Sequence, residues 1–268
     1  MNPSNRLFGK RFFAIFGITK AVRKGGCFAL LCLLFSAAIP RASADNLFAI
    51  DFEDKSYVVG KLSGTMPHVP RDFRWEVMKE GVAEVQTDIV HDGERALRVG
   101  SAACWVRQRF YGTEGIARDR DGIQLLESAV HYYDFWVYPD CEPDDYIVVA
   151  RLVDFADGKC YADIHFANGI IKVYTKFEGE KKPRYVQVEG EWESRKWNRV
   201  TLKIDGAAQK FELFLGGKPC MESPLLLPNK FSGMFWGVYF EGPHSRQEAA
   251  SCYYDDLCWS DTNPLAAK

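Results

Sequence analysis

Short runs rich in β-branched and aromatic residues recur along the chain, and glycine, proline, aspartate or asparagine stands at most of the junctions between them. Runs of this kind, bounded by turn residues, predict β-strands. We expect strands over residues 47–52, 73–78, 96–99, 105–111, 130–138, 146–155, 161–166, 170–177, 184–188, 199–204, 210–215, 234–240 and 252–259. Helical periodicity is confined to single turns predicted at 123–128 and 246–250.

The clearest alternation lies at 199–204, where Val200, Leu202 and Ile204 are predicted to face a core and the intervening polar residues solvent. Asp205-Gly206 and Gly216-Gly217 then predict tight turns. The runs 130–138 and 146–155 are apolar on both faces in places, which is typical of central strands. Many strands without crossover helices predict an all-β fold of two stacked antiparallel sheets, a single domain over 45–268.

Two acidic motifs lie near the ends of this region, Asp51-Phe52-Glu53-Asp54 and Tyr253-Tyr254-Asp255-Asp256-Leu257. Each sets carboxylates within an apolar, strand-like run. Paired acids on the first and last strands are what a closed β-sandwich needs to clip its termini together, and calcium is one ion that could join them. We therefore expect the segments 47–52 and 252–259 to lie side by side.

Residues 1–44 contain seven Lys or Arg and no Asp or Glu, then an apolar run of 13 residues (27–39) and Ala42-Ser43-Ala44. This order predicts a secretory signal cleaved near Ala44 and an exported protein, whether periplasmic, extracellular or on the cell surface. A spanning helix needs about 20 residues, so no stable membrane span is expected. A retained anchor and a start codon placed further upstream are the alternatives.

Without the leader, 27 basic residues face 36 acidic ones, a net charge of −9. A strongly acidic exported domain is a poor general binder of nucleic acid, so no nucleic-acid partner is expected. Six cysteines remain, at 104, 141, 160, 220, 252 and 258. An even count in an exported protein favours disulfides, although Cys252 and Cys258 would share one strand and lie too far apart to bridge. Buried free thiols are the alternative.

Several segments, in this order, resemble the concanavalin A-like jelly-roll domains, including the laminin-G-like and glycan-binding modules of secreted bacterial proteins. They are Asp51-Phe52-Glu53, residues 91–99 (HDGERALRV), residues 197–205 (WNRVTLKID), residues 210–218 (KFELFLGGK) and Tyr254-Asp255-Asp256-Leu257. Together they span nearly all of 45–268. The resemblance implies the fold and leaves the function open, because sugar binders, glycosidases, polysaccharide lyases and adhesion modules share this architecture.

The resemblance also implies a structural calcium ion (Ca2+) held by Glu53, the Asp92-Gly93 turn and Asp256. Calcium takes several oxygen ligands at about 2.4 Å. An ion bound by three segments distant in sequence would crosslink them and stabilise the fold. The alternative is that Glu53 and Asp256 cap turns or pair with Arg95 or Arg98. A calcium site would make the protein less heat-stable in a chelator.

Sugar recognition needs flat aromatic faces beside hydrogen-bonding groups. Most aromatic side chains of a sandwich this size belong to its core. The better ligand candidates are aromatic residues with charged neighbours. They are Trp105 with Arg107 and Arg109, and Trp236 with Tyr239 and Glu241.

No catalytic set is assigned, but two enzyme hypotheses stay open. Lyases of the resembled fold use a Tyr or His base with Arg and amide groups, and Arg107, Arg109, Tyr161 and His165 are the candidates here. At period two, Tyr161, Asp163 and His165 would share a strand face. Asp163 stands where these lyases carry an amide, and this acid would repel a uronate.

A second enzyme hypothesis is glycoside hydrolysis by the alternating Glu189, Glu191 and Glu193, which resemble a glucanase triplet. A solvated acidic loop is the alternative for this segment. We expect a non-catalytic module whose partner is a polysaccharide or cell-surface glycan. A polysaccharide-cleaving enzyme and a structural envelope module are the competing functions.

Overall fold

The computed structural model describes residues 48–62, 73–77, 83–100, 105–110, 130–154, 158–230, 236–245 and 249–266, all within one compact unit, Arg41–Lys268. For residues 48, 73, 74, 76, 105–110, 154, 236 and 237 it describes the backbone alone. These ranges contain strands and no helix, and hence no helix with the length and apolar character to cross a membrane. The predicted signal and the predicted turn at 123–128 lie outside them.

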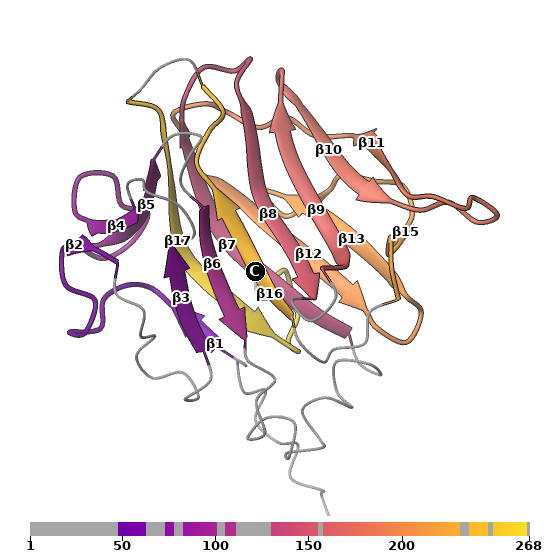
Figure 1. Ribbon diagram of the computed structural model, residues 1–268, viewed down its shortest axis with the longest axis horizontal. Helices are drawn as coiled ribbons and strands as arrows, with labels where there is room; N and C mark the ends of the chain where they lie inside the picture. The colour runs from indigo at the N-terminus through magenta and orange to yellow at the C-terminus, as the bar shows by residue number, and fades with distance from the viewer. Residues whose placement is uncertain are drawn as a thin grey trace, which may run out of the picture. The chain divides into compact units, whose positions relative to one another are not determined.

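The described chain is an all-β fold of two antiparallel sheets (Figure 1). Sheet A has the order β14-β13-β12-β7-β17-β5-β4-β2, with β1 paired to β17 and β15 paired to β13. Its strands are β1 Phe48–Ile50, β2 Gly60–Lys61, β4 Ala83–Gln86, β5 Ala96–Gly100, β7 Val130–Asp140, β12 Asn198–Asp205, β13 Lys210–Leu215, β14 Lys218–Pro219, β15 Leu225–Leu226 and β17 Ser251–Ser260.

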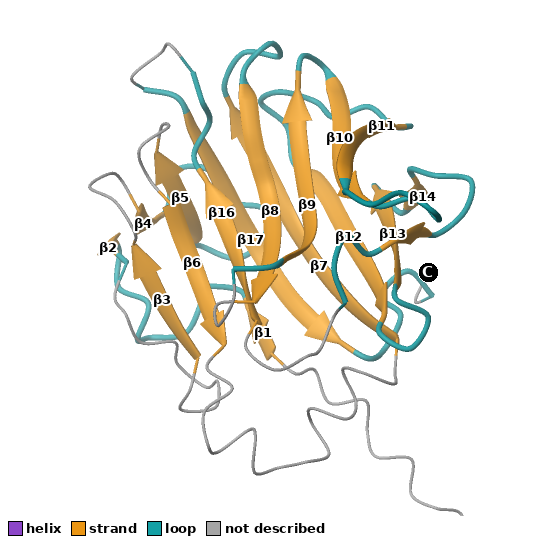
Figure 2. Cartoon of the chain, turned by 45° about the vertical axis from the view of Figure 1, so that its right-hand side comes forward, coloured by secondary structure: helices purple, strands orange, loops and turns teal. Residues whose placement is uncertain are grey.

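Sheet B has the order β11-β10-β9-β8-β16-β6-β3 and lies against sheet A as the second layer (Figure 2). Its strands are β3 Phe73–Val77, β6 Trp105–Phe110, β8 Tyr146–Asp154, β9 Cys160–Ala167, β10 Ile170–Thr175, β11 Arg184–Val188 and β16 Trp236–Glu241. The predicted central strands occupy central places, because β7 lies between β12 and β17 and β8 between β9 and β16. We call the face of each sheet that points away from the other sheet its outer face.

The two ends of the described chain pair with each other, as the acidic motifs predicted. β1 runs antiparallel to β17, with Phe48 opposite Trp259 and Ile50 opposite Leu257. β17 in turn lies between β7 and β5, so the last strand is central in sheet A. The first and last strands therefore pair inside sheet A, and this pairing joins the two ends of the described chain.

The core lies between the sheets. It is formed by the alternate side chains of each strand that point toward the opposite sheet. Val200, Leu202 and Ile204 of β12 are buried in it, as predicted. Ile164 and Phe166 of β9 contribute from sheet B. The predicted turn at Gly216-Gly217 joins β13 to β14 with φ values of 56° and 79°, a combination that favours glycine at both central positions of a tight hairpin turn.

Two predictions from sequence need correction. The strands β2, β4, β14 and β15 were not predicted, because two to four residues are too few to show a period. The disulfide expectation is not supported: the five cysteines in the described ranges, at 141, 160, 220, 252 and 258, are free thiols. Burial is the largest cause that raises the pKa of Cys141 to about 12 and of Cys220 to about 11, as expected of thiols that act as small apolar residues. Cys104 lies outside the described residues.

Candidate functional site

A polar cluster lies on the outer face of sheet B, where β8, β9, β11 and β16 contribute side chains. β9 explains its position, since Ile164 and Phe166 enter the core while Asp163 and His165, at alternate positions, take the opposite face. Arg151 of β8 is the direct partner of Asp163 in the β8–β9 register. Residues opposite one another on neighbouring strands share a face, so the register brings these two charges together.

Asp163 is the centre of this cluster and accepts three hydrogen bonds. Arg151 Nε lies 2.9 Å from Asp163 Oδ2, the Tyr185 hydroxyl lies 2.6 Å from the same oxygen, and His165 Nε2 lies 2.6 Å from Oδ1. The Asp163 side chain is only 4 % exposed. A buried carboxylate with three donors is fully compensated, so it is not the free repulsive acid that the sequence suggested.

Arg151 links this carboxylate to a second one, Glu241 of β16. Arg151 Nη1 lies 3.7 Å from Glu241 Oε1, and His244 Nε2 lies 3.1 Å from Glu241 Oε2. Burial of Arg151 opposes its charge, but Asp163 and Glu241 outweigh that burial and raise the pKa of the guanidinium. Arg151, Asp163 and Glu241, which we call the charged hub, tie β8, β9 and β16 together.

Tyr146 stands beside His165 at the hub. Its hydroxyl lies 2.6 Å from His165 Nδ1 and 3.2 Å from Nε2. His165 Nε2 lies 2.6 Å from Asp163, so we assign the imidazole proton to Nε2, which donates it in a hydrogen bond to Asp163. The unprotonated Nδ1 then accepts the hydrogen bond of the Tyr146 hydroxyl. Burial, followed by the charge of Asp163, raises the pKa of Tyr146 to about 12, so the phenol keeps its proton at neutral pH.

Five rings form a continuous row across this face. The ring centroids are 4.9 Å apart for Tyr174 and Tyr185, 4.6 Å for Tyr185 and His165, 4.8 Å for His165 and Tyr146, and 5.1 Å for Tyr146 and His244. Tyr185 is 42 % exposed, unusually open for a large ring in this fold. We call these five residues the aromatic row; it runs beside the charged hub and joins it through His165, Tyr185 and His244.

The structure brings only some of the predicted site residues together. His165 belongs to the cluster, but it is 3 % exposed and lies behind the Tyr146 hydroxyl. Tyr161 is part of the hydrophobic core and 1 % exposed. The β8–β9 register shifts between Leu152 and Val153, beside Tyr161, and this irregularity breaks the period-two relation to Asp163 that the sequence implied.

The other predicted ligand residues lie on strands next to the hub. Tyr239 is half-buried on β16 and is the register partner of Arg151. Arg107 pairs with Tyr239, and Trp105 with Glu241. The side chains of Trp105, Arg107, Arg109 and Trp236 lie outside the described part of the structure, so their ligand roles stay predictions.

The predicted metal residues lie together around the β1–β17 pair. Glu53 Oε1 accepts the backbone N–H groups of Glu94 and Arg95, each at 2.8 Å, and Arg95 Nη2 lies 3.5 Å from Oε2. Asp256 Oδ2 lies 2.7 Å from His91 Nδ1. A Cβ added at Gly93 would lie 2.5 Å from Glu53 Oε1, so the turn closes tightly on this carboxylate.

These contacts match the alternative in which Glu53 caps a turn and pairs with Arg95. Asp92 Oδ1 accepts the N–H of Gly93 at 2.8 Å, so all three predicted ligands have protein partners. In the described ranges, no group of three His, Cys, Asp or Glu side chains is arranged to hold a metal ion. Calcium at this position therefore stays a prediction to be tested by titration.

The glutamate triplet does not form a strand face. β11 ends at Val188, and Glu189, Glu191 and Glu193 follow it as exposed residues of a loop. Glu193 forms an ion pair with Lys196 there. The geometry needed for paired catalytic carboxylates on one strand is therefore missing from this segment.

Sequence reasoning missed most of the cluster. Tyr146, Arg151, Tyr185 and His244 were not singled out, and Glu241 was noted only as a neighbour of Trp236. The available signal was Arg151 within an otherwise apolar central strand, since a buried strand rarely carries a charge without a partner.

Comparison with known proteins identifies the fold. No family model matches the chain, and no curated protein matches it. Similar solved structures include the receptor-binding domain of botulinum neurotoxin D (TM-score 0.50, 10 % identity) and an HCR/D mutant (TM-score 0.51, 10 % identity); each match covers 81 % of this chain and 49 % of the other. The chain thus spans about half the length of these structures. At this identity the likeness shows a shared β-sandwich and nothing further.

Proposed function

We propose that this protein is an exported module that binds a glycan on the outer face of sheet B. The aromatic row carries the proposal: five adjoining rings, of which Tyr185 and His244 are exposed, lie beside a hub of hydrogen-bonding charged groups. Pyranose rings present C–H faces to aromatic rings and hydroxyls to polar groups. The exposed Tyr185 ring offers the first kind of contact, and the partly exposed Arg151 guanidinium and the His244 imidazole offer the second.

Other features are compatible with this function. The basic and apolar leader supports export. The pairing of the first strand with a central last strand supports a jelly-roll sandwich of the concanavalin A-like kind. The fold comparison contributes the architecture only, because β-sandwiches of this type host many functions. The proposal therefore rests on the described side chains of sheet B.

A glycan array with the purified protein, covering neutral and uronate-containing glycans, tests the proposal. Tyr185→Ala should weaken binding of the best glycan about tenfold, because an exposed stacking ring is lost. Tyr185→Phe keeps the ring and should weaken binding about threefold through the lost hydroxyl contact with Asp163.

Trp197→Ala is the matched control, since Trp197 is half-buried and belongs to the aromatic group of the outer face of sheet A. It should leave glycan affinity unchanged. Loss of binding in Trp197→Ala with full binding in Tyr185→Ala would place the ligand on the other sheet, and an array without any bound glycan would reject the proposal.

Polysaccharide cleavage is a second candidate, favoured by the Tyr146–His165–Asp163 chain of contacts. In this arrangement Tyr146 can accept the C5 proton of a bound uronate while its own proton passes to His165 Nδ1, and Asp163 stabilises the imidazolium that forms. The C4–O bond to the leaving sugar breaks as the C4–C5 double bond forms, and the imidazolium returns the proton through Tyr146 to the leaving oxygen. The candidate predicts turnover of a uronate polymer to unsaturated products. Tyr146→Phe should reduce turnover about 100-fold, whereas Tyr174→Phe, in the same row, should retain it. Binding without turnover in the wild type removes this candidate.

A further inference from the structure

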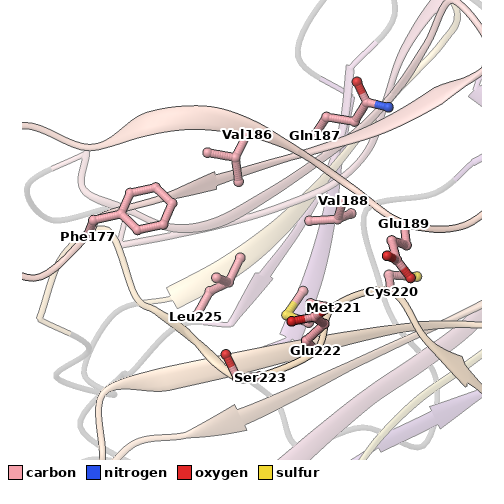
Figure 3. A pocket seen from close by; sticks show the side chains of 10 residues that line it. All are labelled: Phe177, Val186, Gln187, Val188, Glu189, Cys220, Met221, Glu222, Ser223 and Leu225. Atoms are coloured by element: carbon pink, nitrogen blue, oxygen red, sulfur yellow. The ribbon is translucent and has the colours of Figure 1, made fainter.

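A separate cleft lies at the edge of the sandwich, where β11, the terminal strand of sheet B, faces the β14–β15 segment of sheet A. Its volume is about 500 Å³, and ten residues line it: Phe177, Val186, Gln187, Val188, Glu189, Cys220, Met221, Glu222, Ser223 and Leu225 (Figure 3). Two backbone contacts frame it. The Glu189 N–H donates to the Cys220 carbonyl at 2.9 Å, and Lys176 bridges to Leu226.

The cleft is where the described core is least covered. Six partly buried apolar residues pack against the core, and four of them line this cleft: Val186, Val188, Met221 and Leu225. In Figure 3 the side chains of Val186 and Val188 face those of Leu225 and Met221 across the opening, while the Gln187 carboxamide points away. An apolar side chain of a ligand would complete the core at this point.

β11 also has a free edge along the cleft, because among the described strands it is the terminal one of sheet B and pairs only with β10. The N–H of Glu189 points to the β14–β15 segment. Backbone groups two residues apart in an extended strand point the same way, so those of Gln187 and Tyr185 also face this edge. In the described ranges neither residue has a backbone partner on that side.

The charge of the cleft indicates which partner fits. The residues that the structure describes along it include two exposed carboxylates, Glu189 and Glu222, and no Lys or Arg. We propose that an extended peptide from a partner protein adds as a strand to the free edge of β11, with an apolar residue in the cleft and a basic residue facing Glu189 and Glu222. Strand addition uses a free edge for affinity and pockets for alternate side chains for specificity. This site is independent of the glycan face.

Fluorescence anisotropy with the peptide fluorescein-Lys-Val-Lys-Val-Lys-Val-Lys-amide tests the proposal. Gln187→Pro removes the edge N–H without removing a bond to β10, and proline is tolerated on edge strands. This change should raise the Kd at least about tenfold. Gln187→Ala keeps the N–H and should change the Kd less than about twofold. Circular dichroism melts confirm that both variants fold.

Charge and backbone contributions are separated by further arms of the same assay. Glu222→Lys should weaken binding about fivefold, and Glu94→Lys, an exposed acid far from the cleft, should not. A peptide with backbone N-methyl groups on its lysines should bind poorly, because in an antiparallel addition the residues opposite Gln187 and Tyr185 supply the N–H groups that face β11, whereas valines in the cleft turn theirs away. Equal effects of Gln187→Pro and Gln187→Ala, unimpaired binding of the methylated peptide, or no binding by the wild type up to about 1 mM would each overturn the proposal.

Discussion

The two outer faces of the sandwich contain similar groups and use them differently. On sheet A, Asp134 binds Arg199, with Nη2 2.9 Å from Oδ2, and also accepts the Thr201 hydroxyl. On sheet B, Asp163 binds Arg151 and accepts the Tyr185 hydroxyl. Each face thus has an arginine–aspartate pair joined by a hydroxyl donor, and each has aromatic rings next to it.

The difference lies in what covers these groups. On sheet A, Arg199 also donates to the Pro264 carbonyl near the end of the described chain, and the His91 ring stacks on Trp136 at 3.8 Å while Asp256 holds it. On sheet B, the Tyr185 ring is open to solvent. The arginine–aspartate pair is therefore engaged within the protein on both sheets, and what distinguishes sheet B is the exposed ring of Tyr185, the ligand contact that we propose.

The largest expected effect concerns Asp255, a fully buried carboxyl on the sheet A side. Its Oδ2 accepts the His91 N–H at 3.0 Å and its Oδ1 the Asp256 N–H at 2.9 Å. Burial is the main cause that raises the pKa of Asp255 to about 7, although backbone N–H donors oppose the rise. The folded protein thus holds a proton that the unfolded chain releases near pH 4.

Because the folded state binds the extra proton, the stability contributed by Asp255 is complete below about pH 4 and is lost as the pH rises to about 7. The loss amounts to at most about 4 kcal/mol. Urea unfolding at a series of pH values should show this slope in the wild type and lose it in Asp255→Asn. The exposed Asp92→Asn control should keep it. An unchanged slope in Asp255→Asn would contradict the assignment.

The next effect separates the two arginine–aspartate pairs. Asp134→Asn should lower the free energy of unfolding by about 3 kcal/mol, because it leaves the largely buried Arg199 without its counter-charge. Glu212→Gln breaks the more exposed Lys203–Glu212 pair on the same face and should cost less than about 1 kcal/mol. Neither change should alter glycan affinity at a temperature where both variants are folded. Weaker binding by Asp134→Asn would show that sheet A also takes part in recognition.

The strands of both faces could be predicted from sequence, whereas the site could be predicted only in part. Each of the predicted runs corresponds to a strand, and β11 and β13 have the predicted bounds. Period-two patterns survive in these strands because one face of each is buried in a shared core. The two-residue strands β2, β14 and β15 depend on tertiary pairing, which a local pattern cannot show.

The site depends on register between strands distant in sequence. Asp163 and His165 were predicted to share a face, and they do. Which residue of β8 faces them was not predictable, because the β8–β9 register shifts between Val148 and Ala150 and places Arg151, not its neighbours, opposite Asp163. The exposed ring of Tyr185 reaches the hub from an edge strand two strands away, a relation that no local pattern contains.

The smallest expected effect concerns calcium at the β1–β17 pair. Glu53 is engaged by two backbone N–H groups and lies beside the Arg95 guanidinium, which opposes a cation. We therefore expect a chelator to change the melting temperature by less than about 2 °C, since a site that binds weakly contributes little by mass action. Differential scanning calorimetry with added calcium or chelator measures this directly. A larger shift that disappears in Glu53→Gln would instead establish the calcium crosslink that the sequence predicts, and it would require Glu53 to exchange its backbone donors for the ion.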